Sequence, residues 1–294
     1  MKPVKFTRQL AASLEAAVLD LAGTDSDSKF IAGGQSLGPM MNLRLARPRH
    51  LIDISALSEL HGFRENSESL FIGASTTHAD IEDGKVPDPI GGMLQSVAGG
   101  IAYRAIRNRG TVGGSLAHAD PSADWVTTLT TANAIIHTLR LGDDGLPAQA
   151  ARPGFEVSLS RHQILMTDFI QAAYTTALRP GEMIIEVEIP KFSAELRWGY
   201  YKFCRKQGEL AGAMGAVIVD PARLYCRVVA GATGGAPLML EAVAEKLAES
   251  GSPPDAELIK RELLEHLSQR DPVFIQQTCV SIQRAILQMV EGHD

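Results

Sequence analysis

Two glycine-rich segments carry residue types that could bind a phosphorylated ligand. The first consists of Ile31, Ala32, Gly33, Gly34, Gln35, Ser36, Leu37 and Gly38. It follows a predicted strand and precedes a predicted helix, so its amide N–H groups could approach a pyrophosphate closely. It has neither the Gly-Lys-Ser/Thr of a P-loop nor the spacing of a nicotinamide-type dinucleotide fingerprint. An ordinary strand-to-helix turn is the alternative interpretation.

The second segment runs from Arg107 to Trp125 and is the more specific of the two. Its glycine loop consists of Thr111, Val112, Gly113, Gly114 and Ser115, whose amides could form a second phosphate site. Asp120 and Asp124 follow, and on a helix these carboxylates would share one face. Asp120 could instead be only the N-cap of a helix that begins at Pro121. Arg107 and Arg109 could hold phosphate, although ion-paired or solvated arginines are the commoner case.

The elements that must position these segments divide the chain near residue 178. Before it, helical and extended patterns alternate, beginning with a predicted helix over Thr7 to Leu21. After it, strands are predicted at Ile184–Ile189, Tyr200–Arg205, Ala213–Val219 and Arg223–Ala230, and helices at Leu238–Glu249, Pro254–Ser268 and Pro272–Val290. Four strands followed by three helices predict an α+β domain with its helices on one side.

The composition excludes several functional classes. The chain has 294 residues, 45% of them hydrophobic, and a net charge of −6, so it has no general attraction to nucleic acid or to anionic membranes. Its three cysteines include no CxxC pair and cannot supply the four thiolates of an iron–sulfur cluster. No uninterrupted apolar stretch approaches the ~18 residues of a membrane span. We therefore expect a cytoplasmic protein without a metal site of its own.

The segments IAGGQSLGPMMNLRLARPRHLIDIS and IRNRGTVGGSLAHADPSADW together resemble the flavin subunit of molybdenum hydroxylases. This family includes the medium subunit of carbon monoxide dehydrogenase, the corresponding subunit of N-heterocycle hydroxylases such as quinoline 2-oxidoreductase, and the FAD domain of xanthine dehydrogenase. The resemblance implies a two-lobed FAD-binding domain of the vanillyl-alcohol-oxidase (PCMH) type over residues 1–178, with lobes of about 1–56 and 57–178. It further implies a C-terminal α+β domain over 179–294, with a four-stranded antiparallel sheet and a three-helix bundle.

The resemblance also implies which residues bind FAD non-covalently. The two FAD loops fall on Ile31–Gly38 and on Thr111–Ser115, and further flavin contacts fall on Ile101, Asp124, Ile184 and Lys202. The two isoleucines would flank the isoalloxazine ring, and Asp120 is a further candidate from its place beside the second loop. No catalytic residue and no metal ligand are expected in this chain. Where relatives often carry Asp-Phe after the lysine, this chain has Glu209 and Leu210, which leaves the electron acceptor open.

The implied function is that of an electron exit within a larger complex. FAD on this chain would accept electrons from two [2Fe–2S] clusters of a small subunit and pass them to an external acceptor. The substrate, expected to be an N-heteroaromatic compound, would be hydroxylated at the molybdopterin cofactor of a large subunit, in a dimer of heterotrimers. Two alternatives stay open: a self-sufficient FAD oxidase of the vanillyl-alcohol-oxidase type, and a nucleotide-binding scaffold without redox activity.

Overall fold

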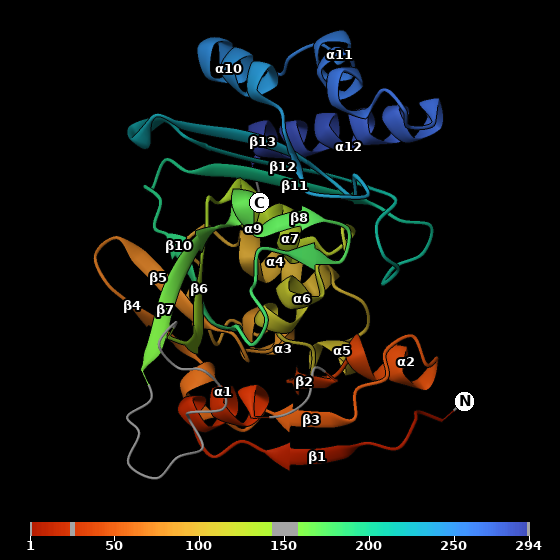
Figure 1. Ribbon diagram of the computed structural model, residues 1–294. Coiled ribbons are helices and arrows are strands. Elements are labelled where there is room, and N and C mark those ends of the chain that lie inside the picture. The colour runs from red at the N-terminus through yellow and green to blue at the C-terminus, as the bar shows by residue number, and fades with distance from the viewer. Residues whose placement is uncertain (1, 24–26, 143–157, 293–294) are drawn as a thin grey trace.

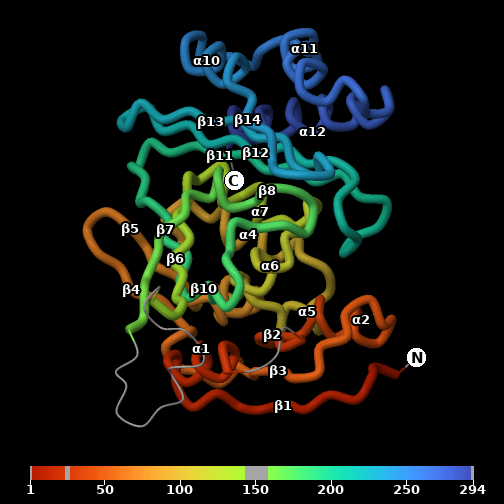
Figure 2. Tube along the Cα trace, in the orientation of Figure 1, coloured from red at the N-terminus to blue at the C-terminus, as the bar shows by residue number. Residues whose placement is uncertain are grey.

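The computed structural model describes residues 2–23, 27–142 and 158–292. Three layers follow one another from the N-terminal strands at the bottom of Figure 1 to the C-terminal helices at its top. The trace in the same orientation shows the chain rising through these layers largely in sequence order (Figure 2). Among the described helices, none is long and apolar enough to cross a bilayer.

The N-terminal layer is a three-stranded parallel sheet with the order β1-β3-β2. Its elements are β1 (Thr7–Leu10), α1 (Leu14–Ala22), β2 (Ser28–Ile31), α2 (Leu37–Asn42) and β3 (His50–Asp53). The predicted helix over Thr7 to Leu21 is wrong in its first part, because Thr7–Leu10 pairs with β3. The helix begins at Leu14, after Ser13 caps it by accepting a hydrogen bond from the amide of Ala16.

The middle layer is a five-stranded antiparallel sheet with six helices beside it among the residues that the structure describes. Its strands, in spatial order, are β4 (Phe63–Glu65), β5 (Ser69–Gly73), β10 (Met183–Pro190), β6 (Ile135–Leu141) and β7 (Leu159–Leu165). The helices are α3 (His78–Glu82), α4 (Met93–Gly100), α5 (Arg104–Arg107), α6 (Val112–His118), α7 (Asp124–Thr131) and α9 (Met166–Phe169). The 3₁₀ helix η1 (Ser58–Leu60) precedes β4, and β8 (Ile170–Ala172) pairs with β9 (Thr175–Thr176).

Strand β10 corrects the predicted strand arrangement. The sequence pattern places Ile184–Ile189 in the C-terminal sheet, but this strand lies at the centre of the middle sheet. Glu186 pairs with Gly73 of β5 on one side, and Val187 pairs with Ile136 of β6 on the other. Because both partners are distant in sequence, local pattern cannot assign the strand to a sheet. We propose that the domain boundary lies after β10, within residues 191–196, instead of near residue 178.

The C-terminal layer is a four-stranded antiparallel sheet covered by three helices. The strands are β11 (Arg197–Phe203), β12 (Ala213–Asp220), β13 (Tyr225–Gly231) and β14 (Leu238–Met239), with the 3₁₀ helix η2 (Pro221–Arg223) between β12 and β13. The helices are α10 (Glu241–Ser250), α11 (Ala256–Leu267) and α12 (Pro272–Glu291), which confirms the three predicted helices. Helix α12 packs on one face of β11 and β12, whereas α7 packs against β12 and β13 (Figure 1).

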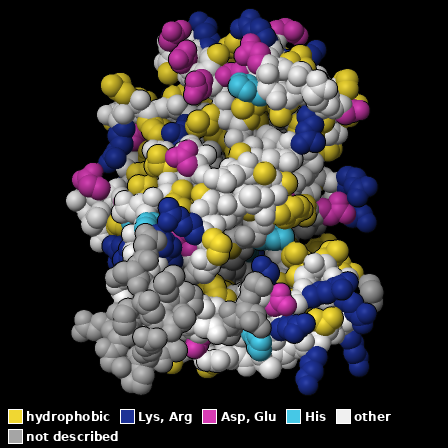
Figure 3. Space-filling view, viewed as in Figure 1, with side chains coloured by type: hydrophobic (Ala, Val, Ile, Leu, Met, Phe, Trp, Pro, Cys, Tyr) yellow, Lys and Arg dark blue, Asp and Glu magenta, His cyan; other side chains and the backbone are white. Residues whose placement is uncertain are grey.

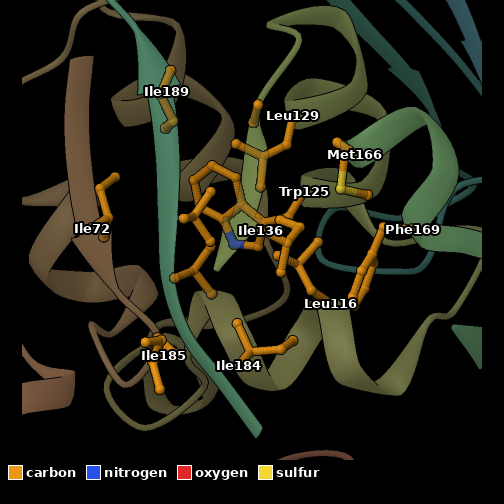
Figure 4. Packing of buried hydrophobic residues seen from close by; sticks show 14 of the residues in the cluster. Ile72, Leu116, Trp125, Leu129, Ile136, Met166, Phe169, Ile184, Ile185 and Ile189 are labelled. Carbon is orange, nitrogen blue, oxygen red and sulfur yellow. The ribbon is translucent and has the colours of Figure 1, made fainter. Parts of the chain in front are cut away.

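A continuous apolar core joins the middle layer to the sheets on either side. Trp125 lies within it among side chains from β6 and β10, and Ile184 points into the same core (Figure 4). The indole Nε1 of Trp125 donates to Nδ1 of His78 at 3.0 Å, so the buried ring has its polar atom paired. Helix α6, whose N-cap and first residues are the second glycine loop, and helix α7 after it are therefore fixed from behind by packed side chains.

Candidate functional site

A cleft of about 1680 Å³ opens where the N-terminal and middle layers meet the loop after β11. This exceeds the roughly 300–1,000 Å³ typical of sites for drug-sized ligands, so the cleft has room for a dinucleotide. Both glycine segments line it. Lys and Arg side chains gather beside it over the N-terminal segment and α2, at the lower right of Figure 3.

The first glycine segment presents unpaired backbone donors. The amides of Gly34, Gln35 and Ser36, all of which line the cleft, donate to no acceptor within the described ranges. Gly34 has φ = +70°, a left-handed conformation that turns the chain between β2 and α2. The side chain of Gln35 donates back to the carbonyl of Gly33 at 3.0 Å and holds the turn closed. Such a row of free amides is suited to an anionic group.

Other glycines let each segment pack closely against a neighbouring part of the chain. A Cβ on Gly33 would lie 1.8 Å from the carbonyl oxygen of Arg109, and a Cβ on Gly113 would lie 2.6 Å from the Cβ of Ala74. The carbonyl of Gly33 also accepts a long hydrogen bond, 3.4 Å, from Nε of Arg109. Gly33 therefore serves the contact between the two segments, Gly113 serves the contact of the second segment with the chain after β5, and Gly34 serves the turn at the cleft.

The amides of the second segment are used differently from the predicted nest. The amides of Val112 and Gly113 donate to backbone carbonyls between β5 and α3. Those of Gly114 and Ser115 donate to Oγ1 and the carbonyl of Thr111, which caps α6. Thr111, Gly114 and Ser115 still line the cleft. The local sequence could not reveal the acceptors of the first two amides because they belong to another element.

Asp124 links the cleft to the C-terminal sheet. Its Oδ1 accepts hydrogen bonds from the hydroxyl of Tyr200 at 2.7 Å and from Nζ of Lys202 at 2.8 Å. Both charged side chains are almost buried, with exposed fractions of 7% for Asp124 and 11% for Lys202. Burial, and then the adjacent Asp124 charge, raise the pKa of Tyr200 well above its usual value, so this hydroxyl stays a donor. Oδ2 of Asp124 has no hydrogen-bond partner in the part of the chain that the structure describes.

Asp120 lies at the cleft outside any helix. Helix α7 begins at Asp124 and not at Pro121, so the predicted N-cap role of Asp120 is wrong. Instead Oδ1 of Asp120 accepts from the amide of Ser122 at 2.9 Å and closes a turn. The rings of Tyr174 and His118, which line the same wall, lie 5.2 Å apart.

The structure brings most, but not all, of the predicted residues to the cleft. The residues that line it are Ile31, Ala32, Gly33, Gly34, Gln35, Ser36, Leu37, Ile101, Thr111, Gly114, Ser115, Asp120 and Asp124. The predicted residues outside its lining are Gly38, Val112, Gly113, Ile184 and Lys202. Ile184 lies in the core because β10 is a central strand. Lys202 does not line the cleft itself but forms an ion pair with Asp124, which does.

Several residues that line the cleft were not predicted. Four of them lie in segments without a recognisable binding motif: Arg140 of β6, Tyr174, Arg179 and Gly181. His78 lines it as well, and burial, with a smaller effect of the Arg107 charge, lowers the pKa of this imidazole to about 4. His78 is therefore neutral at physiological pH, as its acceptor role toward Trp125 requires. The only sequence signal for Gly181 is its place in the turn Arg179-Pro180-Gly181.

Comparison with known proteins is consistent with this geometry. The family described as the FAD-binding domain in molybdopterin dehydrogenase matches residues 4–145. The chain is 34% identical to the carbon monoxide dehydrogenase medium chain of Hydrogenophaga pseudoflava, over 74% of this chain and 70% of that protein. It is 36% identical to the nicotine 6-hydroxylase medium subunit of Paenarthrobacter nicotinovorans, over 76% and 72%.

Similarity to a solved structure extends over the whole chain. A chain in the crystal structure of quinoline 2-oxidoreductase from Pseudomonas putida 86 matches with a TM-score of 0.80 at 28% identity. The match covers 99% of both chains and includes the C-terminal layer. The protein therefore belongs to the family of FAD-binding subunits of molybdenum hydroxylases and is an oxidoreductase subunit whose cofactor is FAD.

Proposed function

We propose that FAD binds in the cleft with its pyrophosphate against the first glycine segment. The observation that carries this proposal is the row of amides at Gly34, Gln35 and Ser36, which have no acceptor within the described ranges and belong to residues that line the cleft of a chain of net charge −6. An acidic protein needs such a local device to hold two phosphates. Thr111, Gly114 and Ser115 form the facing wall and limit where the phosphates can lie.

The remaining cleft residues suit the other parts of FAD. Oδ2 of Asp124 is an acceptor for a hydroxyl of the ribityl chain or of the ribose, because its Oδ1 is already engaged. Ile101 offers an aliphatic face to the isoalloxazine ring. Ile184 supports this region from the core and makes no direct contact, and Lys202 acts through Asp124. Bound FAD supplies a redox centre that accepts electrons singly and in pairs.

We further propose the place of this chain in a complex. Electrons arrive from the [2Fe–2S] clusters of a small subunit and leave to an external acceptor, while substrate is hydroxylated at a molybdopterin cofactor on a large subunit. The names of the related nicotine 6-hydroxylase and quinoline 2-oxidoreductase support an N-heteroaromatic substrate. A dimer of heterotrimers in the cytoplasm completes the proposal, and three free cysteines suit a reducing compartment.

A pair of glycine substitutions tests FAD binding in the cleft. Gly34→Asp places a carboxylate beside the unpaired amides, where the phosphates are proposed to lie. Gly62→Asp is the matched control: Gly62 also has a left-handed φ, +73° against +70°, and a Cβ there meets open space away from the cleft lining. After extensive dialysis against buffer, wild type and Gly62→Asp should retain one FAD per chain. Full flavin content in Gly34→Asp would contradict the proposed site.

A further inference from the structure

A three-residue turn presents Ile101 to the cleft, and cationic side chains hold each of its carbonyl groups. Nζ of Lys202 donates to the carbonyl of Gly100 at 2.9 Å. Nη1 of Arg107 donates to the carbonyls of Ile101 at 2.9 Å and Ala102 at 3.1 Å. The two cations come from different elements, β11 and α5. The turn is thus held from the C-terminal layer and from the middle layer at once.

The backbone of this turn has a conformation that needs such support. Ala102 has φ = +41°, in the left-handed region that a residue with a Cβ rarely adopts. The turn joins two helices, since α4 ends at Gly100 and α5 begins at Arg104. Surrounding contacts must therefore fix the conformation, and in this turn the bonds to Arg107 and Lys202 do so.

Arg107 is itself rigidly anchored. Its Nε and Nη2 donate to the two carboxylate oxygens of Glu82, each at 2.7 Å, in a bidentate pair. Its side chain is only 11% exposed. Every nitrogen of the guanidinium group is therefore engaged, two with the carboxylate of α3 and one with the turn. A lysine could not reproduce this fork.

We infer that Arg107, anchored on Glu82, is a positioning residue that fixes the turn Gly100–Ala102 and so orients Ile101 toward the flavin. Lys202 couples the same turn to Asp124, because its ammonium group contacts both the Gly100 carbonyl and Oδ1 of Asp124. Lys202 thus fixes the position of the turn that carries Ile101 relative to Asp124. The inference rests on the proposed function, namely that FAD binds in this cleft.

Arg104 offers a matched control. It also pairs with Glu82, at 2.7 Å, and with Asp83, at 2.6 Å, but none of its hydrogen bonds within the described residues reaches the turn. Arg107→Met and Arg104→Met remove the same charge from the same helix and from the same acidic partner. Arg107→Lys keeps the charge and most of the volume but loses the fork, so it serves if the methionine variant does not fold.

The test measures the dissociation constant of FAD and the visible circular dichroism of the bound flavin in the full chain. Arg107→Met and Arg107→Lys should bind FAD at least tenfold more weakly than wild type and alter the visible dichroism, whereas Arg104→Met should stay within threefold with an unaltered spectrum. Wild-type affinity and dichroism in Arg107→Lys, or an equal loss in Arg104→Met, would overturn the inference while leaving FAD binding intact. Failure of wild type itself to bind FAD would instead reject the proposed function.

Discussion

At the scale of single residues, the two oxygens of Asp124 have separate tasks. Oδ1 accepts from the ammonium group of Lys202 and from Tyr200, while Oδ2 has no hydrogen-bond partner among the described residues of the chain. The cation near the proposed flavin site is therefore paired within the protein. A lone lysine would instead impose its full charge on the cleft.

We expect Asp124→Asn to destabilise the protein even without FAD. The substitution keeps the shape of the side chain but leaves the nearly buried Lys202 without its carboxylate partner, at a cost of about 3 kcal/mol in the free energy of unfolding. Asp120 lines the same cleft but forms no buried ion pair within the described residues, so Asp120→Asn should lower the free energy of unfolding by less than about 1 kcal/mol. Urea unfolding of both apoproteins measures this. Equal stability of the two variants would contradict a structural role of the pair.

The lowered pKa of buried His78 makes the free energy of unfolding depend on pH. Its pKa is about 4 in the folded chain, against about 6.5 in the unfolded chain, so the unfolded state binds more protons between these values. The contribution of neutral His78 to the free energy of unfolding is fully present above pH 6.5. It is lost as the pH falls toward 4, by about 3 kcal/mol in total. His78→Gln keeps an acceptor for Trp125 without titrating. Its free energy of unfolding should fall less steeply over this interval, and parallel pH curves would refute the assignment.

At the scale of elements, the contact between the two glycine segments determines the shape of the cleft. Gly33 abuts the backbone of Arg109, so the two segments approach more closely than a residue with a Cβ permits, and Gly113 abuts Ala74 after β5. The sequence predicts both glycine segments and their order, because a cluster of glycines is a local feature. It does not predict that the amides of the second loop are already bonded to protein carbonyls, since two of the acceptors lie between β5 and α3, far away in the sequence.

Gly33→Ala should separate the loops and weaken FAD binding. A Cβ at this position would lie 1.8 Å from the carbonyl oxygen of Arg109, so the backbone has to move. We expect at least a tenfold rise in the FAD dissociation constant and a loss of roughly 1–3 kcal/mol in stability. Gly38→Ala is the control, since a Cβ there meets open space within α2. Fluorescence titration with FAD decides, and equal affinities in the two variants would contradict the loop contact.

At the scale of the whole molecule, the C-terminal sheet holds both ends of α7. Tyr200 and Lys202 of β11 bind Asp124 at the first residue of the helix. At the other end, Nη1 of Arg227 donates to the carbonyl of Thr130 at 2.8 Å, and the hydroxyl of Tyr225 donates to the carbonyl of Thr131 at 2.5 Å. The C-terminal layer therefore positions a cleft residue while contributing few residues to the cleft itself.

Arg227→Met should consequently destabilise the whole protein. The substitution removes a charge-assisted bond to the carboxyl end of α7, and we expect a loss of about 2 kcal/mol. Arg205→Met is the control, because Arg205 is exposed and its one ion pair within the described ranges is a 3.7 Å contact with Glu209. Chemical denaturation of both variants measures the difference. A stability of Arg227→Met equal to that of the control would argue against the clamp.

Sequence patterns predict the helices well but do not predict which distant strands pair. The helices predicted over Leu238–Glu249 and Pro272–Val290 are confirmed because their apolar spacing is local, except that Leu238–Met239 forms β14 and the first helix begins at Glu241. The strand at Thr7–Leu10 and the sheet membership of Ile184–Ile189 are not, since each depends on partners far along the chain. Ile184 is placed at the flavin by resemblance alone, and the structure places it in the core.

The central claim is that this chain carries FAD for a partner and does not oxidise substrate by itself. The most direct measurement is anaerobic mixing of the isolated, FAD-loaded chain with quinoline or nicotine, followed by addition of the small and large subunits. The visible flavin band should stay unchanged until the partners are present and should bleach afterwards. Bleaching before their addition would contradict the claim and restore the self-sufficient oxidase. Bleaching of the complete complex by carbon monoxide but by neither heterocycle would reject the N-heteroaromatic substrate alone.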